Sequence, residues 1–194
     1  AEMAVNVPIV EGKVAARAVL GYQDSSGWID KPNKQDVNDV ERRNARLKIN
    51  AQPTDEFSIG LSAWLSRADY GAPSAANDDG LRASLIDEPT SADYDAYGLQ
   101  LRYDFPRFSI SSATSYLDYE NHWILDLAPG VGQRYDGTIP AKTFAEEVLL
   151  NSTGTGPWRW TAGSMYRDSE DSLTYVIERV NVVRYLDTRT SKSY

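Results

Sequence analysis

Apolar and polar residues alternate at every second position over much of the chain. The alternation is clear over residues 45–51 and 97–104, and in the first of these Leu47 and Ile49 flank Lys48. Successive side chains of a β-strand point to opposite faces, so a period of two indicates strands with one apolar and one polar face. No long window shows the i, i+3, i+4, i+7 spacing of an amphipathic helix.

The pattern predicts about eight strands. They lie near residues 3–10, 13–24, 41–52, 57–69, 93–104, 107–119, 142–152 and 158–169. Their lengths of about 8–13 residues exceed the 5–6 typical of globular sheets. They match the roughly 9–11 residues with which a tilted strand crosses a bilayer. Soluble sandwiches also contain strands of about ten residues, so length alone favours a membrane protein only slightly.

The connections between these strands alternate in length. Turns rich in Pro, Gly and Asp are predicted at 10–13, 52–56, 105–106 and 153–157, and long polar stretches at about 25–40, 70–92 and 120–141. Consecutive connections of a meander lie at opposite ends of the strands, so the short turns are all at one end of the sheet's strands and the long stretches are all at the other. This asymmetry is typical of outer-membrane barrels, which have short periplasmic turns and long external loops.

Aromatic residues gather toward the ends of the predicted strands. Six of them are candidates for the boundary between lipid and water: Tyr22, Tyr97, Tyr103, Tyr116, Trp158 and Trp160. The edge of a sandwich core, or cross-strand aromatic pairing, explains these positions equally well. Glu146 opposes the membrane interpretation, because it shares a strand face with Phe144 and Val148 and a lipid-facing carboxylate is costly at the bilayer midplane.

Composition excludes several classes of protein. The chain has 194 residues and a net charge of −8, which argues against a nucleic-acid partner. The lack of cysteine excludes disulfides, thiol catalysis and Cys-ligated metals, and a single histidine excludes multi-His zinc sites. Mean hydropathy is −0.49, and no apolar run approaches the roughly 20 residues of a transmembrane helix.

The sequence predicts no catalytic, metal or cofactor site. His122 shares a predicted strand face with Glu120 and Asp126, where a solvated acidic patch is favoured over a metal site. Glu146 and Glu147 are adjacent and point to opposite faces of a strand, so they cannot flank one glycosidic bond. No Gly-x-Ser-x-Gly nucleophile elbow is present. We therefore expect a protein that is not an enzyme.

Several groups of residues follow one another in a distinctive order. They are Asn6–Val10 with Lys13–Arg17, Gly27–Asp30 with Asp36–Asp39, Ala45–Ile49 with Gln52–Asp55, Ser112–Tyr116, Phe144–Leu150 and Trp158–Gly163. Together they resemble the first part of the β-barrel of TonB-dependent outer-membrane receptors. Ser191–Tyr194 is similar to the opening of a further strand. The resemblance spans nearly the whole chain, and its specificity lies in the order and spacing of the groups.

The resemblance implies an all-β fold, an antiparallel up-and-down meander forming about eight strands of a transmembrane β-barrel. Residues 1–194 are expected to be one partial barrel domain, with a plug domain and the remaining strands outside it. The location implied is the outer membrane of a Gram-negative bacterium. A complete member takes up a scarce ligand such as a ferric siderophore, vitamin or oligosaccharide. The implied partners are outer-membrane lipid, that small-molecule or oligosaccharide ligand, and an inner-membrane TonB complex acting through the plug.

On this interpretation, residues of the polar strand faces line the barrel lumen or contact the plug. The candidates are Arg46, Lys48, Gln100, Arg102 and Glu147. Two alternatives remain open. One is a soluble β-sandwich module that binds carbohydrate or another partner, with Trp28 or Trp123 as the exposed aromatic. The other is a self-contained eight-stranded outer-membrane barrel.

Overall fold

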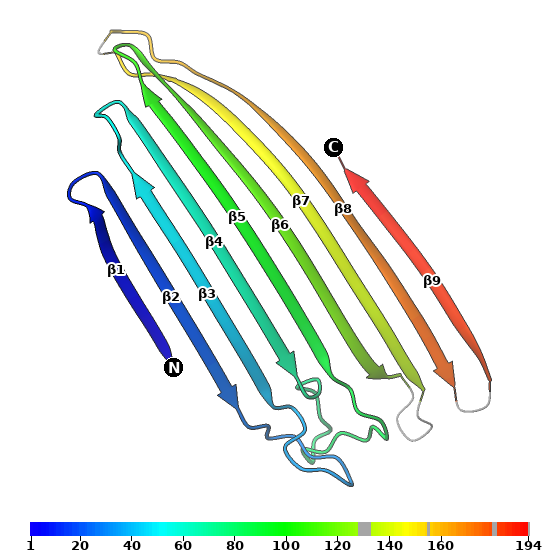
Figure 1. Ribbon diagram of the computed structural model, residues 1–194. Helices are drawn as coiled ribbons and strands as arrows, with labels where there is room; N and C mark the ends of the chain where they lie inside the picture. The colour runs from blue at the N-terminus through cyan, green and yellow to red at the C-terminus, as the bar shows by residue number, and fades with distance from the viewer. Residues whose placement is uncertain (128–132, 155, 180–181, 194) are drawn as a thin grey trace.

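The computed structural model is built from one antiparallel sheet (Figure 1). The structure describes residues 1–127, 133–154, 156–179 and 182–193. The strands are β1 (Glu2–Val10), β2 (Val14–Ser25), β3 (Val40–Ala51), β4 (Phe57–Tyr70), β5 (Thr90–Asp104), β6 (Phe108–Asp126), β7 (Arg134–Ser152), β8 (Thr161–Arg179) and β9 (Val182–Ser193). They pair in sequence order from β1 to β9. The predicted all-β up-and-down meander is confirmed.

The strands are more numerous and longer than the sequence pattern predicts. There are nine in the described residues rather than about eight, and β6, β7 and β8 each have 19 residues. The loop expected over 120–141 is wrong, because β6 and β7 continue to pair there up to Asp126 and Arg134. In this region Trp123, Leu125 and Tyr135 share one face, and the charged side chains of Glu120 and Asp136 lie on the other. The alternation therefore changes phase relative to the rest of these strands, although the ladder continues. Residues 128–132 lie outside the described residues.

Two further boundaries differ from the prediction. The strand expected over 158–169 begins later, at Thr161, so Trp158 and Trp160 lie in the connection that precedes β8. The backbone N–H of Trp160 donates to Ser152 Oγ at 2.8 Å. Ser191–Ser193 end β9 instead of opening a new strand, and Tyr194 lies outside the described residues.

Short and long connections lie at opposite ends of the strands. At one end are the short connections, residues 11–13, 52–56, 105–107 and 153–160 (Figure 1). At the other end are the longer segments 26–39 and 71–89. β1 and β9 are the two edge strands of the sheet, and each pairs with a single neighbour. In the part of the chain that the structure describes, the sheet is therefore open, with neither the second sheet of a sandwich nor the closure of a small barrel.

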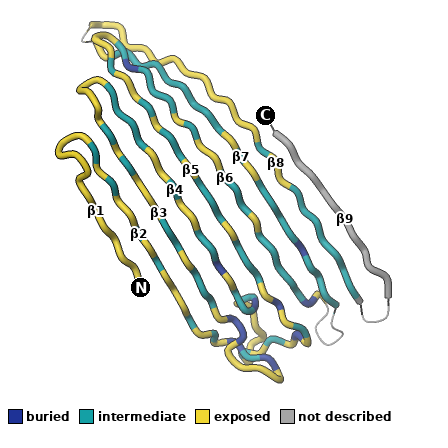
Figure 2. The backbone as a smooth tube through the Cα atoms, viewed as in Figure 1, coloured by how far each residue is buried: buried dark blue, intermediate teal, exposed yellow. Residues whose placement is uncertain are grey.

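The sheet encloses almost no core (Figure 2). Among the described residues, the buried hydrophobic side chains are Ile29, Val37, Ala68 and Ala72. The accessible surface is 13010 Å², whereas a compact monomer of this mass exposes about 9,200 Å². No helix in the described residues is long and apolar enough to cross a membrane. The large apolar side chains of the strands thus remain on the outside of the sheet.

The small core lies instead between the two long connections. Ile29, Val37 and Ala72 form one buried cluster. Asn38 holds it together, because its Oδ1 accepts the backbone N–H groups of Trp28 and Ile29 at 2.7 and 2.8 Å. These bonds satisfy backbone donors that would otherwise be buried without partners.

Gly27 is required for this close approach. A Cβ at residue 27 would collide with the backbone carbonyl of Asp36 and lie 2.8 Å from the Asn38 nitrogen. We predict that Gly27→Ala opens the cluster and raises proteolysis within 71–89 several-fold. Gly156→Ala is the matched control, since a Cβ there meets nothing within 4 Å. Equal proteolysis in both variants would contradict this packing.

Candidate functional site

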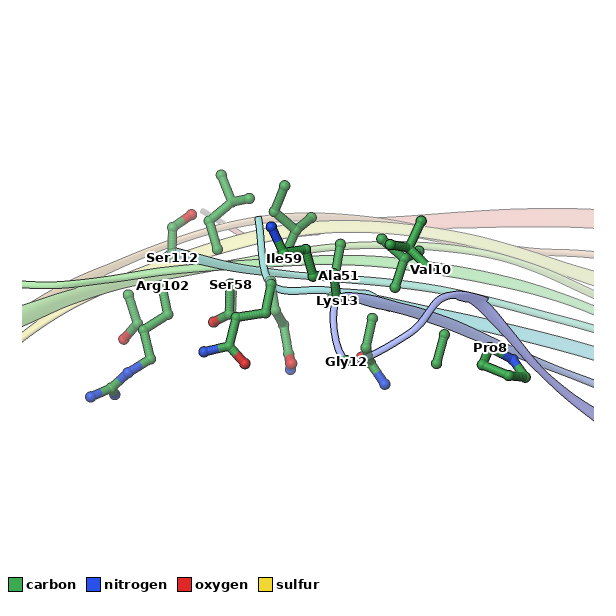
Figure 3. Close-up of a pocket in the computed structure, with 18 residues that line it drawn as sticks. Pro8, Val10, Gly12, Lys13, Ala51, Ser58, Ile59, Arg102 and Ser112 are labelled. Atoms are coloured by element: carbon green, nitrogen blue, oxygen red, sulfur yellow. The ribbon is translucent and has the colours of Figure 1, made fainter. Parts of the chain in front are cut away.

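The register of the strands sorts the side chains onto two faces. Residues paired across antiparallel strands point to the same side of the sheet. One row contains Lys48, Ser62, Gly98 and Ser115, and the adjacent row contains Leu47, Ala63, Tyr97 and Tyr116. We call the side that carries Lys48 the polar face and the side that carries Leu47 the apolar face. Figure 3 shows this division, with Ser58 and Arg102 on one side of the sheet and Ile59 and Ser112 on the other.

The predicted lumen residues all lie on the polar face. The register places Arg46, Lys48, Gln100, Arg102 and Glu147 there together. Arg102 bonds Asp104 at 2.5 Å, and the guanidinium of Arg46 lies 4.9 Å from the centre of the Trp64 ring. Their shared side follows from the strand register, while their place in a barrel lumen stays a prediction.

The polar face is hollowed in several places. One hollow of about 640 Å³ lies near the short connections and includes Asn50, Ser58, Gln100 and Arg102 (Figure 3). A second, of about 700 Å³, lies over β2, β3 and β4. Gly60 lines the first hollow and Gly21 the second, and neither has a side chain that could fill the space.

The apolar face carries a continuous band of exposed hydrophobic side chains. Its largest members include Leu20, Leu47, Leu61 and Leu65, which are 53%, 43%, 46% and 37% exposed. Exposed patches of this kind mark a surface that another apolar phase or partner covers. Within the described residues, no element of the chain packs on this band.

Aromatic rings border the band at both ends. Near the short connections, the rings of Phe57, Tyr103, Phe105 and Phe108 form a chain with centroids 4.5–6.3 Å apart. At the other border, the register places Tyr97, Tyr116 and Phe144 opposite one another on adjacent strands. Tyr22 and Tyr166 lie on the same face and are 47% and 53% exposed.

Charged residues begin directly beyond the second aromatic border. Arg67 bonds Asp95 at 2.5 Å, and Lys142 lies 3.2 Å from Asp118. Asp95 lies two positions before Tyr97 on β5, and Asp118 lies two positions after Tyr116 on β6, so the two carboxylates are opposite each other on the same face. On β5, β6 and β7 the apolar face therefore changes from hydrocarbon to aromatic to charged within a few residues.

The predicted border aromatics divide into two groups. Tyr22, Tyr97, Tyr103 and Tyr116 lie on the apolar face. Trp158 and Trp160 lie in the connection before β8 and are 86% and 49% exposed. The sequence predicts a strand at these two tryptophans because, with one residue between them, they have the spacing of one strand face. The structure places them in a connection instead.

Glu146 lies within the apolar band, as its strand face predicts. Ser112 Oγ donates to its Oε1 at 2.5 Å, and the hydroxyl of Thr114 donates to its Oε2. Both donors come from β6, where Thr114 is directly opposite Glu146. The carboxylate thus has a partner on each oxygen, which offsets part of the cost of removing it from water.

The remaining candidates lie in a loop and on both faces of the sheet. Trp28 is 68% exposed in the 26–39 connection. Trp123 lies on the polar face beside Tyr135, with ring centroids 6.2 Å apart, and Tyr135 contacts Tyr175 at 5.2 Å. His122 lies on the other face, where its Nε2 is 2.8 Å from Asp136 Oδ1. The structure therefore does not bring the two tryptophans together.

Sequence reasoning missed the charged centre of the long connections, Glu88. Its side chain is fully buried and accepts a bond from Arg82 Nη2 at 2.5 Å, while Lys31 Nζ lies 3.5 Å away. The backbone N–H of Asp126, at the end of β6, also donates to it at 2.8 Å. Glu88 thereby joins both long connections to the sheet, and only their contact in three dimensions reveals this.

Hydrogen bonding sets the charge state of Glu88. Burial alone would raise the pKa of its carboxyl, but the bonds from Arg82 and from the Asp126 backbone outweigh burial and hold the pKa below its ordinary value of 4.5. The ionised form is therefore the one that stabilises the packed connections.

Comparison with known proteins supports the fold at the level of structure. The chain is similar to the crystal structure of the ferric yersiniabactin uptake receptor FyuA from Yersinia pestis, with a TM-score of 0.83 and 13% sequence identity. The match covers 98% of this chain and 32% of that receptor, so the chain spans about a third of its length. No protein-family model and no curated protein matches the sequence. At this identity the likeness shows the fold alone.

The pKa of Glu88 generates a pH prediction. A carboxyl whose pKa is lowered by folding stabilises the folded state above its unfolded pKa, and this stability is lost as pH falls through the folded value. Proteolysis of 71–89 with an acid-active protease should therefore stay low above pH 4.5 and rise below it.

Glu88→Gln should remove most of this dependence and raise cleavage at neutral pH. It leaves the buried Lys31 and the partly exposed Arg82 without a counter-charge, a change that costs on the order of 3–5 kcal/mol where the remaining charge is buried. Asp87→Asn is the control, because that side chain is exposed. If the Glu88→Gln variant is cleaved at the same rate as the unchanged protein at every pH, Glu88 does not hold the two long connections together.

Proposed function

We propose that the chain forms part of the wall of an outer-membrane transport barrel, acting in binding and uptake rather than catalysis. One observation carries this: an uncovered apolar band lies between two aromatic borders, opposite a hollowed polar face. A barrel wall with lipid outside and a polar lumen has this division of faces. The end of the strands that carries the long connections and the Glu88 network faces the outside of the cell.

The proposal extends to TonB-dependent uptake of a scarce ligand such as a ferric siderophore, vitamin or oligosaccharide. The sequence resemblance supports it, and so does the fold shared with a receptor whose own name describes ferric yersiniabactin uptake. The long connections 26–39 and 71–89 are placed to contact ligand. Arg46, Lys48, Gln100, Arg102 and Glu147 face the lumen or the plug.

Deletion of the gene in its host tests the transport function. Uptake of a panel of labelled ferric siderophores, cobalamins and oligosaccharides is measured with and without the gene, and with and without a protonophore. The proposal expects one class to lose energy-dependent uptake and to regain it on complementation. Unchanged uptake across all three classes would contradict it.

Cysteine labelling tests the assignment of the two faces. The chain has no cysteine of its own, so each introduced thiol is unique. Leu47→Cys should react with a membrane-confined maleimide and resist a charged one, and Lys48→Cys should do the reverse. The two residues are adjacent on β3 and differ only in face. The opposite result, or equal labelling by both reagents, would refute the assignment.

A charge placed on each face gives an energetic test. Leu61→Arg puts a guanidinium in the apolar band between its two aromatic borders, whereas Ser62→Arg puts it on the polar face. We predict that Leu61→Arg lowers the free energy of unfolding in lipid vesicles by about 2–4 kcal/mol, as expected near the bilayer midplane. Ser62→Arg should change it by less than about 1 kcal/mol. Similar losses for both would contradict a lipid-facing band.

A further inference from the structure

Four cationic side chains share the second hollow of the polar face. They are Arg17 from β2 and Arg42, Arg46 and Lys48 from β3. Trp64, Asn44 and Ser66 complete most of the lining, and Glu2 is its one acidic member. We call this surface the basic groove. It concentrates four positive charges in a chain whose net charge is −8.

These four cations lack the acidic partners that cations elsewhere in the chain have. In the described residues, none of them lies within ion-pair distance of a carboxylate, whereas eight other Lys and Arg side chains do. Arg42 instead donates to the Tyr70 hydroxyl at 2.9 Å, and Arg46 lies over Trp64. Their charges are therefore available to an external anion.

The arrangement is unfavourable for the sheet itself. Arg17 and Lys48 are directly opposite each other on β2 and β3, and like charges in that position destabilise an antiparallel pair. The same row continues with neutral residues, Ser62, Gly98 and Ser115. Neutral polar residues are enough to make a lumen wall hydrophilic, and they would avoid this repulsion between like charges. A bound anion would offset the repulsion among the four cations.

We propose that the basic groove binds a small molecule bearing two or more carboxylate or phosphate groups. Arginine offers paired donors that match either group, and lysine adds a point charge. From Arg42 to Lys48 the cations span about 20 Å along β3, at about 3.4 Å per residue, so separate anionic groups bind at successive levels. Trp64 contacts an apolar part of the same molecule. The inference deepens the proposed function and rests on it for the lumen position of the groove.

Binding of citrate and of tripolyphosphate to the purified protein in neutral detergent micelles tests this directly. Calorimetry should show saturable binding of at least one of them, weakening as salt increases, and none of glucose. Arg46→Gln and Lys48→Gln should each weaken binding about ten-fold or more, as expected for a lost charge-assisted bond. Arg67→Gln is the control, because it removes one charge from the apolar face, where Arg67 is paired with Asp95.

Each outcome has a defined meaning. Preference for citrate or for tripolyphosphate identifies carboxylate or phosphate as the recognised group. Absence of saturable binding, or equal weakening by Arg46→Gln and Arg67→Gln, overturns the inference. If Lys48→Cys labels from water but neither anion binds, the inference alone fails. If Lys48→Cys labels from lipid, the proposed barrel orientation fails as well.

Discussion

Side chains that alternate across a single layer of strands leave one apolar surface without a partner, and the rest of the structure depends on that surface. In a globular domain, a second layer would cover Leu47, Leu61 and their neighbours. Here the described residues provide no such layer, and the buried apolar core is confined to the long connections. The hydrophobic effect then favours the sheet only where another apolar phase covers it. Lipid bordered by aromatic rings meets that requirement.

The same constraint separates two kinds of polar chemistry. On the polar face the side chains line an open hollow, so the cations of the basic groove can stay charged without a carboxylate partner. In the long connections, by contrast, charge is buried and must be paired, and Glu88 joins Lys31 and Arg82 at one point. Glu146 is the intermediate case, since it lies in the apolar band with both oxygens bonded to hydroxyl groups of β6.

Residue alternation predicts the strands and both faces well, because a period of two is local and every strand repeats it. The five lumen candidates share a face because they occupy the polar phase of their own strands. The extension of β6 and β7 is not predicted, because the apolar residues there, such as Trp123 and Tyr135, lie on the polar face and the alternation changes phase while cross-strand pairing continues. The alternation does not predict the Glu88 network or the basic groove either. Both depend on contacts between residues far apart in the sequence, such as Glu88 with Asp126 and Arg17 with Lys48.

The most direct measurement is the transfer of nuclear Overhauser effects from lipid acyl chains to methyl groups of the protein in nanodiscs. If lipid covers the apolar face, strong effects are expected at Leu61, Ala63 and Leu99, which lie on it. No effect is expected at Ala96 and Ala113, which lie on the polar face of neighbouring strands. Equal effects on both faces, or effects confined to Ala96 and Ala113, would contradict a lipid-facing apolar band.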